Sequence, residues 1–160
     1  MSMSPVIGDL TCLMSRYLYH AIDQRSKWDS FFKLDCFDAV RVELDFWFKN
    51  LKTFSSKSLG SYALPKTVDY SDASNIAAGA FIVGFNGMWN DHEILISSTW
   101  RELKAILYTI RSFKFILNNE RIIWHTDNKN CEPKVKKGST KEHLQVIALK
   151  IFQICYQFNI

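Results

Sequence analysis

Three acidic residues lie where their carboxylates can be brought together. Asp72 ends a stretch, residues 66–72, whose side chains alternate as a strand requires, and Asp127 ends a short β-branched and aromatic stretch, residues 121–126. Glu102 lies near the start of an amphipathic helix. Carboxylates in one pocket repel one another unless a cation neutralises them, and hard oxygen ligands favour Mg²⁺ or Mn²⁺. The sequence therefore predicts a divalent-metal site formed by Asp72, Glu102 and Asp127.

Helix and strand geometry support this convergence. A helix turns about 100° per residue, which places Glu102 on the flank of Ile106, at the margin of the apolar stripe. Its side chain is therefore expected to point toward the sheet. Neighbouring strands lie about 4.8 Å apart, so two strand ends can hold Asp72 and Asp127 side by side.

Each acid also has a simpler explanation. Thr99 and Glu102 have the spacing of a capping box. Asp127 can be the N-cap of a following helix, and Asp72 can begin an Asx-turn with Ser74. The ordered set of strand acid, helix acid and strand acid arises by accident much less often than any one of them.

Apolar periodicity predicts two N-terminal helices. The first covers residues 6–22, and the second begins after Asp35, a plausible N-cap. The second carries five large apolar residues on one side: Val40, Leu44, Trp47, Phe48 and Leu51. Residues 55–65, rich in serine and closed by a proline, are the predicted linker.

The remainder reads as β-β-β-α-β-α. After the strand at 66–72, a turn at Asn75 and Ile76 leads to a strand at 77–85, and Asn86-Gly87 predicts a hairpin to a third strand at 89–96. Helices are predicted at 97–118 and 140–158, with the fourth strand at 121–126 between them. Residues 127–137 are polar and basic, with at most a short helix.

Composition excludes several classes of protein. In 160 residues, 48% are hydrophobic and 22% charged, a balance that excludes a disordered chain. The longest apolar run, 77–85, is too short to cross a membrane, and the N-terminus lacks the pattern of a secretory signal. The expected location is intracellular, cytoplasmic or nuclear. Four widely spaced cysteines are expected to be reduced core thiols, the tryptophans are expected in the core, and the net charge of +4 is compatible with a polyanionic partner.

The ordered motifs resemble the ribonuclease H domain of retroelement reverse transcriptases, of the gypsy and DIRS type. The motifs are D-Y-S-D-A-S-N, S-T-W-R-E-L-K-A-I, W-H-T-D-N and K-G-S-T-K-E-H-L-Q, and the likeness covers residues 62–160. Upstream, V-E-L-D-F-W-F-K-N-L resembles the connection segment of such polyproteins. The resemblance implies three parts: a helical connection segment at 1–54, a linker at 55–65 and a ribonuclease H-like domain at 66–160, incomplete at its C-terminus.

The resemblance also implies an α/β fold and a reaction. The fold is a ribonuclease H-like mixed sheet, three antiparallel strands plus a parallel fourth with the fifth missing, flanked by helices and preceded by two more. The reaction is two-metal hydrolysis of the RNA strand of RNA–DNA hybrids, with Asp72, Glu102 and Asp127 as catalytic metal ligands and Asp72 touching both ions. The implied partners are the hybrid and an upstream reverse transcriptase domain. Predicted nucleic-acid contacts are Ser74, Asn75, Asn128, Lys134, Lys136 and Lys137.

The sequence departs from the family at its end. The family has a fourth carboxylate after a fifth strand, whereas no acid follows Glu142 here, and His143 is predicted to be helical rather than catalytic. The chain is therefore expected to be a C-terminally truncated piece with weak or absent cleavage. One alternative is an inactive remnant that only binds nucleic acid; another is an integrase or transposase of the same superfamily, in which the glutamate comes last rather than second. The basic segment that includes Lys129 and Lys141 can equally be a solvated loop.

Overall fold

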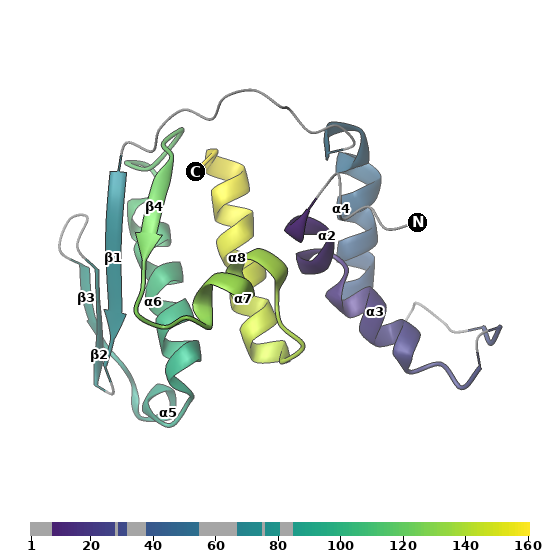
Figure 1. Cartoon of the computed structure of the whole chain (residues 1–160), viewed down its shortest axis with the longest axis horizontal. Coiled ribbons are helices and arrows are strands. Elements are labelled where there is room, and N and C mark those ends of the chain that lie inside the picture. The colour runs from purple at the N-terminus through teal and green to yellow at the C-terminus, as the bar shows by residue number, and fades with distance from the viewer. Residues whose placement is uncertain (1–7, 28, 32–37, 55–66, 75, 81–84) are drawn as a thin grey trace.

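The computed structural model describes residues 8–27, 29–31, 38–54, 67–74, 76–80 and 85–160. It is an α/β arrangement in which a sheet lies on one side of the molecule and helices on the other (Figure 1). Among the described residues, no helix is long and apolar enough to cross a membrane.

Four strands form one mixed sheet in the order β3-β2-β1-β4. Their bounds are Thr67–Ala73 for β1, Ala77–Ala80 for β2, Phe85–Met88 for β3 and Ile122–His125 for β4. The first three strands pair antiparallel, and β4 runs parallel to β1. The predicted mixed sheet, three antiparallel strands plus a parallel fourth, is therefore confirmed.

Helix α6 (Ser98–Phe113) packs on β1 and β2, and α8 (Glu142–Phe158) packs on α6. The short helix α7 (Cys131–Lys137) connects β4 to α8, in the segment where at most a short helix was predicted (Figure 1). Apolar side chains at helical spacing on α6 and α8 form the main core: Trp100, Leu103, Ile106, Leu107, Ile110, Leu144, Ile147 and Ile151. The two predicted helical stripes are thus the faces by which these helices meet.

The opposite face of the sheet is exposed. Side chains alternate along a strand, so Ser71 faces α6 and is buried, whereas Val68 and Tyr70 point the other way and are exposed. On β4, Ile123 is exposed in the same manner. Asp72 and Asp127 are exposed on the same alternation, which places them on the open face where β1 and β4 end.

The predicted single helix at 6–22 is wrong. The structure has α2 (Asp9–Leu13) and α3 (Arg16–Asp23), separated at Met14 and Ser15. The carboxylate of Glu43 accepts the backbone N–H groups of Tyr17 at 3.0 Å and Leu18 at 2.8 Å. These donors have no intrahelical partner at a helix start, so a buried acid from another helix lets a new helix begin there.

The buried face of α4 (Asp38–Phe54) also differs from the apolar stripe. Val40 and Glu43 are buried and Trp47 is half-buried, but Leu44 and Phe48 are exposed. Leu51, on the same stripe, is exposed as well. The buried face of α4 is determined by the hydrogen bonds of two residues. Glu43 accepts from α3, and Trp47 Nε1 donates to Met14 O at 2.9 Å. The predicted N-cap, Asp35, lies outside the described residues.

The predicted hairpin at Asn86-Gly87 and the strand at 89–96 are wrong. Both residues lie inside β3, where Gly87 pairs with Ala78, so the chain reverses between β2 and β3 instead. The segment after β3 forms a one-turn helix, α5 (Asp91–Ile94). Asn75, a predicted turn residue, lies outside the described residues. Residues 81–84 of the predicted 77–85 strand lie outside them as well.

A capping box explains why residues 91–94 are helical. The Asn90 side chain accepts the Glu93 N–H at 3.0 Å, and the Glu93 carboxylate accepts the Asn90 N–H at 3.1 Å. The N-D-H-E spacing in the sequence is the signal for this cap. Local hydrogen bonding therefore makes this segment a helical turn rather than the predicted strand at 89–96.

The N-terminal helices pack against α8. Leu13 and Met14 form a buried cluster with Ala148, and the Gln145 Nε2 donates to Leu13 O at 2.9 Å. Figure 1 shows α8 between α6 and these helices. The predicted linker, residues 55–65, lies outside the described residues, and a domain boundary there stays a prediction.

Three of the four cysteines lie in the described part and are free thiols: Cys12, Cys131 and Cys155. Cys131 is buried and the other two are half-buried, consistent with the predicted reduced core thiols. Cys36 lies outside the described residues. Trp89 and Trp100 are buried, Trp47 and Trp124 half-buried, as expected for core side chains.

Candidate metal centre

Asp72, Glu102 and Asp127 converge in the structure. Each offers a carboxylate oxygen, and these three oxygens lie within 4.8 Å of one another. Glu102 is buried, with 3% of its surface exposed, whereas both aspartates are exposed. The predicted meeting of three acids that are distant in sequence is confirmed.

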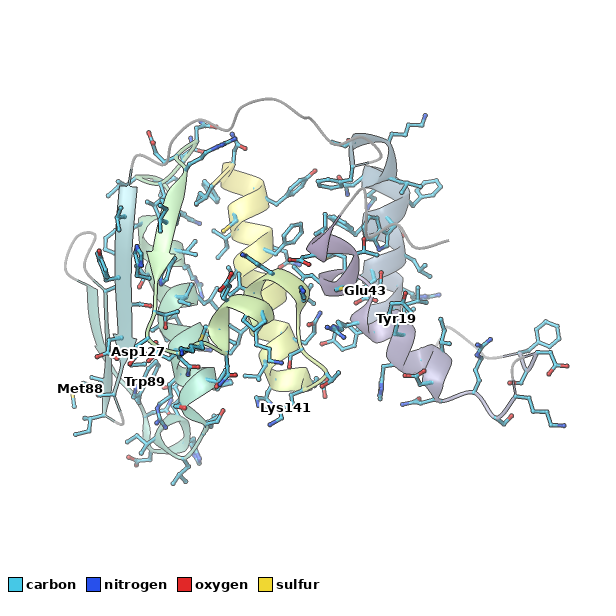
Figure 2. The ribbon with its side chains drawn as sticks, in the orientation of Figure 1. Tyr19, Glu43, Met88, Trp89, Asp127 and Lys141 are labelled. Atoms are coloured by element: carbon cyan, nitrogen blue, oxygen red, sulfur yellow. The ribbon has the colours of Figure 1, made fainter. Side chains whose placement is uncertain are left out.

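The sheet register places the two aspartates level with each other. Tyr70 on β1 pairs with His125 on β4, and the two strands are parallel. Two residues further along each strand come Asp72 and Asp127, so both carboxylates point to the same side at the same height. Figure 2 shows Asp127 just past the end of β4, where the chain turns toward α7. Parallel pairing of β1 with β4 is therefore what brings these acids together.

Two hydrogen bonds to the sheet hold Glu102. Its carboxylate accepts the Ala73 N–H at 2.9 Å and the Thr126 hydroxyl at 3.4 Å. Ala73 and Thr126 directly follow Asp72 and directly precede Asp127, so one helix residue joins both strand ends. The helix acid is thus positioned by the strands that carry the other two acids.

Burial and charge act together on Glu102. Burial raises the pKa of the Glu102 carboxyl above its usual value, and repulsion from Asp127 and Asp72 raises it further. The bonds from Ala73 and Thr126 act in the opposite direction. Three carboxylates kept this close without a counter-charge are unfavourable, so the protein maintains an arrangement that a cation would relieve.

The simpler explanation for Glu102 is wrong. The N-cap of α6 is Ser97 rather than Thr99, and the Glu102 carboxylate bonds to the strands, so no capping box forms.

The simpler explanations for the aspartates are also wrong. Helix α7 begins at Cys131 with Asn130 as its N-cap, which leaves Asp127 outside the cap. Asp72 is paired within β1, and the Ser74 N–H donates to Ala77 O. None of the three acids is therefore explained by capping or a turn.

The donor set fits a hard divalent cation. All three donors are carboxylate oxygens, the ligands that Mg²⁺ and Mn²⁺ prefer. The thiol of Cys131 is buried, and burial, with the charges of Glu102 and Asp127, raises its pKa to about 12. Among the described residues, Cys131 does not belong to the group of side chains placed to share an ion. The cluster is therefore an all-oxygen site.

The predicted nucleic-acid contacts fall into two groups. Ser74 lines the same cavity as Asp72 and Asp127, and Asn128 follows Asp127 directly. Both also make local bonds: Ser74 Oγ accepts the Ala77 N–H, and Asn128 Oδ1 accepts the Asn130 N–H. Asn75 lies outside the described residues.

The second group lies on α7. Lys136 pairs with Glu132 at 2.6 Å, and Lys137 lies 3.6 Å from Asp9. Lys134 is half-buried in the last turn of α7. Neighbouring acids thus partly neutralise two of the three lysines predicted to follow a phosphate backbone. Their role in binding stays a prediction.

Two aromatic residues beside the acids were not among the predicted site residues. Tyr70 and His125 line a cavity of about 870 Å³ together with Asp72 and Asp127. Each precedes one of the aspartates by two residues, so strand alternation puts ring and carboxylate on one face. That spacing was the available signal, but the pairing of the two rings depends on the strand register, which the sequence does not give.

Comparisons with known proteins identify no relative: the chain matches no family model, no curated protein and no solved structure.

Proposed function

We propose that this chain carries a ribonuclease H-type site that hydrolyses the RNA strand of RNA–DNA hybrids with divalent metal. The observation that supports this most is the meeting of Asp72, Glu102 and Asp127 across β1, α6 and β4. The sheet has three antiparallel strands and a fourth parallel to the first, which is the arrangement that the motif resemblance implies for these four strands. The fold is accordingly proposed to be ribonuclease H-like.

The three acids have separable tasks in this proposal. Asp72 and Asp127 are exposed and border the cavity, so they face an incoming phosphodiester. Glu102 is buried and oriented by Ala73 and Thr126, so it holds its carboxylate in place before the substrate arrives. A bound divalent cation supplies positive charge beside the phosphate and lowers the pKa of a water. Attacking and leaving groups are then both oxygens, and the reaction uses no Ser or Cys nucleophile.

Substrate contacts extend from the acids. Ser74 and Asn75 follow β1, and Asn128 follows Asp127; all three are proposed to contact the RNA strand, whose 2′-hydroxyl distinguishes it from DNA. Lys134, Lys136 and Lys137 are proposed to lie along a phosphate backbone. An upstream reverse transcriptase domain is the proposed partner in the parent polyprotein.

A cleavage assay tests the proposal. A hybrid labelled on either strand is incubated with the protein and Mg²⁺ or Mn²⁺, with Asp72→Asn as the test variant and Asp91→Asn, an exposed acid of α5, as the control. We expect at most weak, metal-dependent cutting of the RNA strand, and Asp72→Asn should reduce it on the order of a hundredfold, because charge stabilisation at the phosphate is lost. Asp91→Asn should cut as the unaltered chain does. Equal cutting by Asp72→Asn, or cutting of the DNA strand, contradicts the proposal.

A second candidate is a protein that binds hybrids without cutting them. Within the described residues, the carboxylate group that can hold a metal has three members, whereas the resemblance implies four. Of the two ions that the resemblance implies, one then has fewer carboxylate ligands and is expected to bind less tightly. Binding of the hybrid with no RNA product in either metal would favour this candidate.

A further inference from the structure

Two aromatic rings stand side by side next to the carboxylates. Tyr70 and His125 are paired across β1 and β4, with ring centroids 4.8 Å apart and an interplanar angle of 16°. Both residues are exposed, Tyr70 to 53%.

The ring pair and the carboxylates belong to one cavity. Tyr70 and His125 border it together with Asp72 and Asp127, and Gly79 and Ala80 border it from β2. Gly79 pairs with Asp72 and has no side chain, which leaves room beside that carboxylate. The cavity therefore has an aromatic part, a small-residue part and an acidic part.

The spacing suits a nucleotide. Two residues along a strand span about 6.6 Å, which is the separation along the strands between the ring pair and the acids. This is about twice the 3.4 Å rise per nucleotide of a stacked strand. A phosphate at the carboxylates can thus place a base of its own or of the adjacent nucleotide on the rings.

We propose that Tyr70 and His125 form a stacking surface for an unpaired nucleobase next to the phosphate that is cut. Both faces of a base inside a duplex are covered by its neighbours, so only an unpaired or terminal base can stack on protein rings. The proposal rests on the proposed function and narrows its substrate: the site takes RNA at the end of a hybrid, where a nucleotide leaves the duplex.

Binding in Ca²⁺, measured by the anisotropy of a labelled nucleic acid, separates this proposal from catalysis. The probes are a blunt RNA–DNA hybrid and the same hybrid with a short single-stranded RNA tail. The test variants are Tyr70→Ala and His125→Ala. Val68→Ala and Ile123→Ala are matched controls, because this pair occupies the same strands and the same face two residues earlier.

We expect the tailed hybrid to bind more tightly than the blunt one. Tyr70→Ala and His125→Ala should each reduce that preference about tenfold, the range of one base–aromatic stack. A tail whose first nucleotide is abasic should lose the preference in the unaltered chain and lose nothing further in His125→Ala. The control variants should keep it, and thermal melting confirms that all variants are folded.

Three results overturn the proposal: equal binding of tailed and blunt hybrids, a preference kept in both Ala variants, or an equal loss in the controls. Failure of the proposed function has a different result: the chain still binds the tailed hybrid more tightly than the blunt one but does not cleave RNA in Mn²⁺.

Discussion

The hydrogen bonds and the burial of Glu102 distinguish the acid cluster from a group of ordinary surface residues. A glutamate near the start of a helix is ordinarily a surface or capping residue, yet this one is 3% exposed and bonds to Ala73 and Thr126. A buried carboxylate is unfavourable unless it is paired. Its two hydrogen bonds offset part of the cost of burying the charge, and repulsion from the two nearby aspartates adds to that cost. A bound cation would offset this cost, which gives a physical reason for three carboxylates to lie together.

The convergence of the three acids could be predicted from the sequence because acids at strand ends follow simple rules. The alternation along 66–72 put Asp72 at the end of a strand, and helical periodicity put Glu102 beside the buried stripe. The ring pair of Tyr70 and His125 was missed, since only the observed register makes them neighbours. The partners of Glu102 could not be foreseen either, because they are backbone and hydroxyl groups of other elements.

Glu43 gives a prediction about pH. Burial raises the pKa of its carboxyl above the usual value, in spite of the N–H groups of Tyr17 and Leu18. A raised folded-state pKa means that the folded chain binds this proton more tightly than the unfolded chain. The stability that Glu43 contributes is then full below the ordinary glutamate pKa of 4.5, and it is lost as pH rises through the folded-state pKa.

Urea unfolding between pH 4 and pH 8 tests this for the unaltered chain and Glu43→Gln. The free energy of unfolding of the unaltered chain, relative to the variant, should fall as pH rises. Asp91→Asn, which removes an exposed acid of α5, is the control. A relative stability that instead rises with pH means that the bonds from α3 outweigh burial.

At the scale of elements, periodicity predicted the long helices and local bonding decided the rest. The apolar faces predicted for α6 and α8 are the faces that they bury against each other, because apolar residues at helical spacing lie on one side of a helix. The hairpin at Asn86-Gly87 failed, since a turn propensity is weak against the pairing of β3 with β2. The helix at 6–22 was divided by an acid 26 residues away from Tyr17.

Gly138, between α7 and α8, gives a second prediction. Its φ of 73° and ψ of −169° lie in a region that essentially only glycine adopts. A Cβ there would also collide with the side chain of Gln145. Gly8 has a similar φ of 68° but open space around it, so it is a matched control.

Gly138→Ala should lower the free energy of unfolding by about 2–4 kcal/mol, from backbone strain plus displacement of Gln145. Gly8→Ala should lower it by about 1–2 kcal/mol through strain alone. Chemical denaturation measures both. Equal losses would show that Gln145 moves aside freely, and that the bond from Ser139 N to Gln145 Oε1 does not fix the junction.

At the scale of the whole molecule, the N-terminal helices and the sheet-bearing part share α8. One side of α8 meets α6 and the other meets α2, with Ala148 fully buried at the second contact. The serine-rich composition of residues 55–65 predicted a division of the chain there, and composition carries no information on which faces pack together. The apolar positions that join the two parts, Leu13 and Met14, were predicted only as part of a helical stripe.

Leu13→Ala tests whether the two parts unfold together. Leu13 is 2% exposed, so truncation should lower the free energy of unfolding by about 2–4 kcal/mol. Tryptophan fluorescence and circular dichroism should still report one coincident transition. Phe48→Ala, on an exposed face of α4, should change stability by less than about 0.5 kcal/mol. A separate early transition in Leu13→Ala would show that the N-terminal helices unfold as an independent unit.

The central claim is that Asp72, Glu102 and Asp127 act as one cation site, and direct titration with Mn²⁺ tests it. Calorimetry on metal-free protein should show binding that each of Asp72→Asn, Glu102→Gln and Asp127→Asn weakens at least about tenfold, since each removes one charged ligand. Without metal, Asp127→Asn should melt no lower than the unaltered chain because repulsion is relieved. Mn²⁺ should raise the melting temperatures of the unaltered chain and of Asp91→Asn more than those of the three site variants. Asp91→Asn should bind as the unaltered chain does. Equal Mn²⁺ binding in all five proteins would contradict the account.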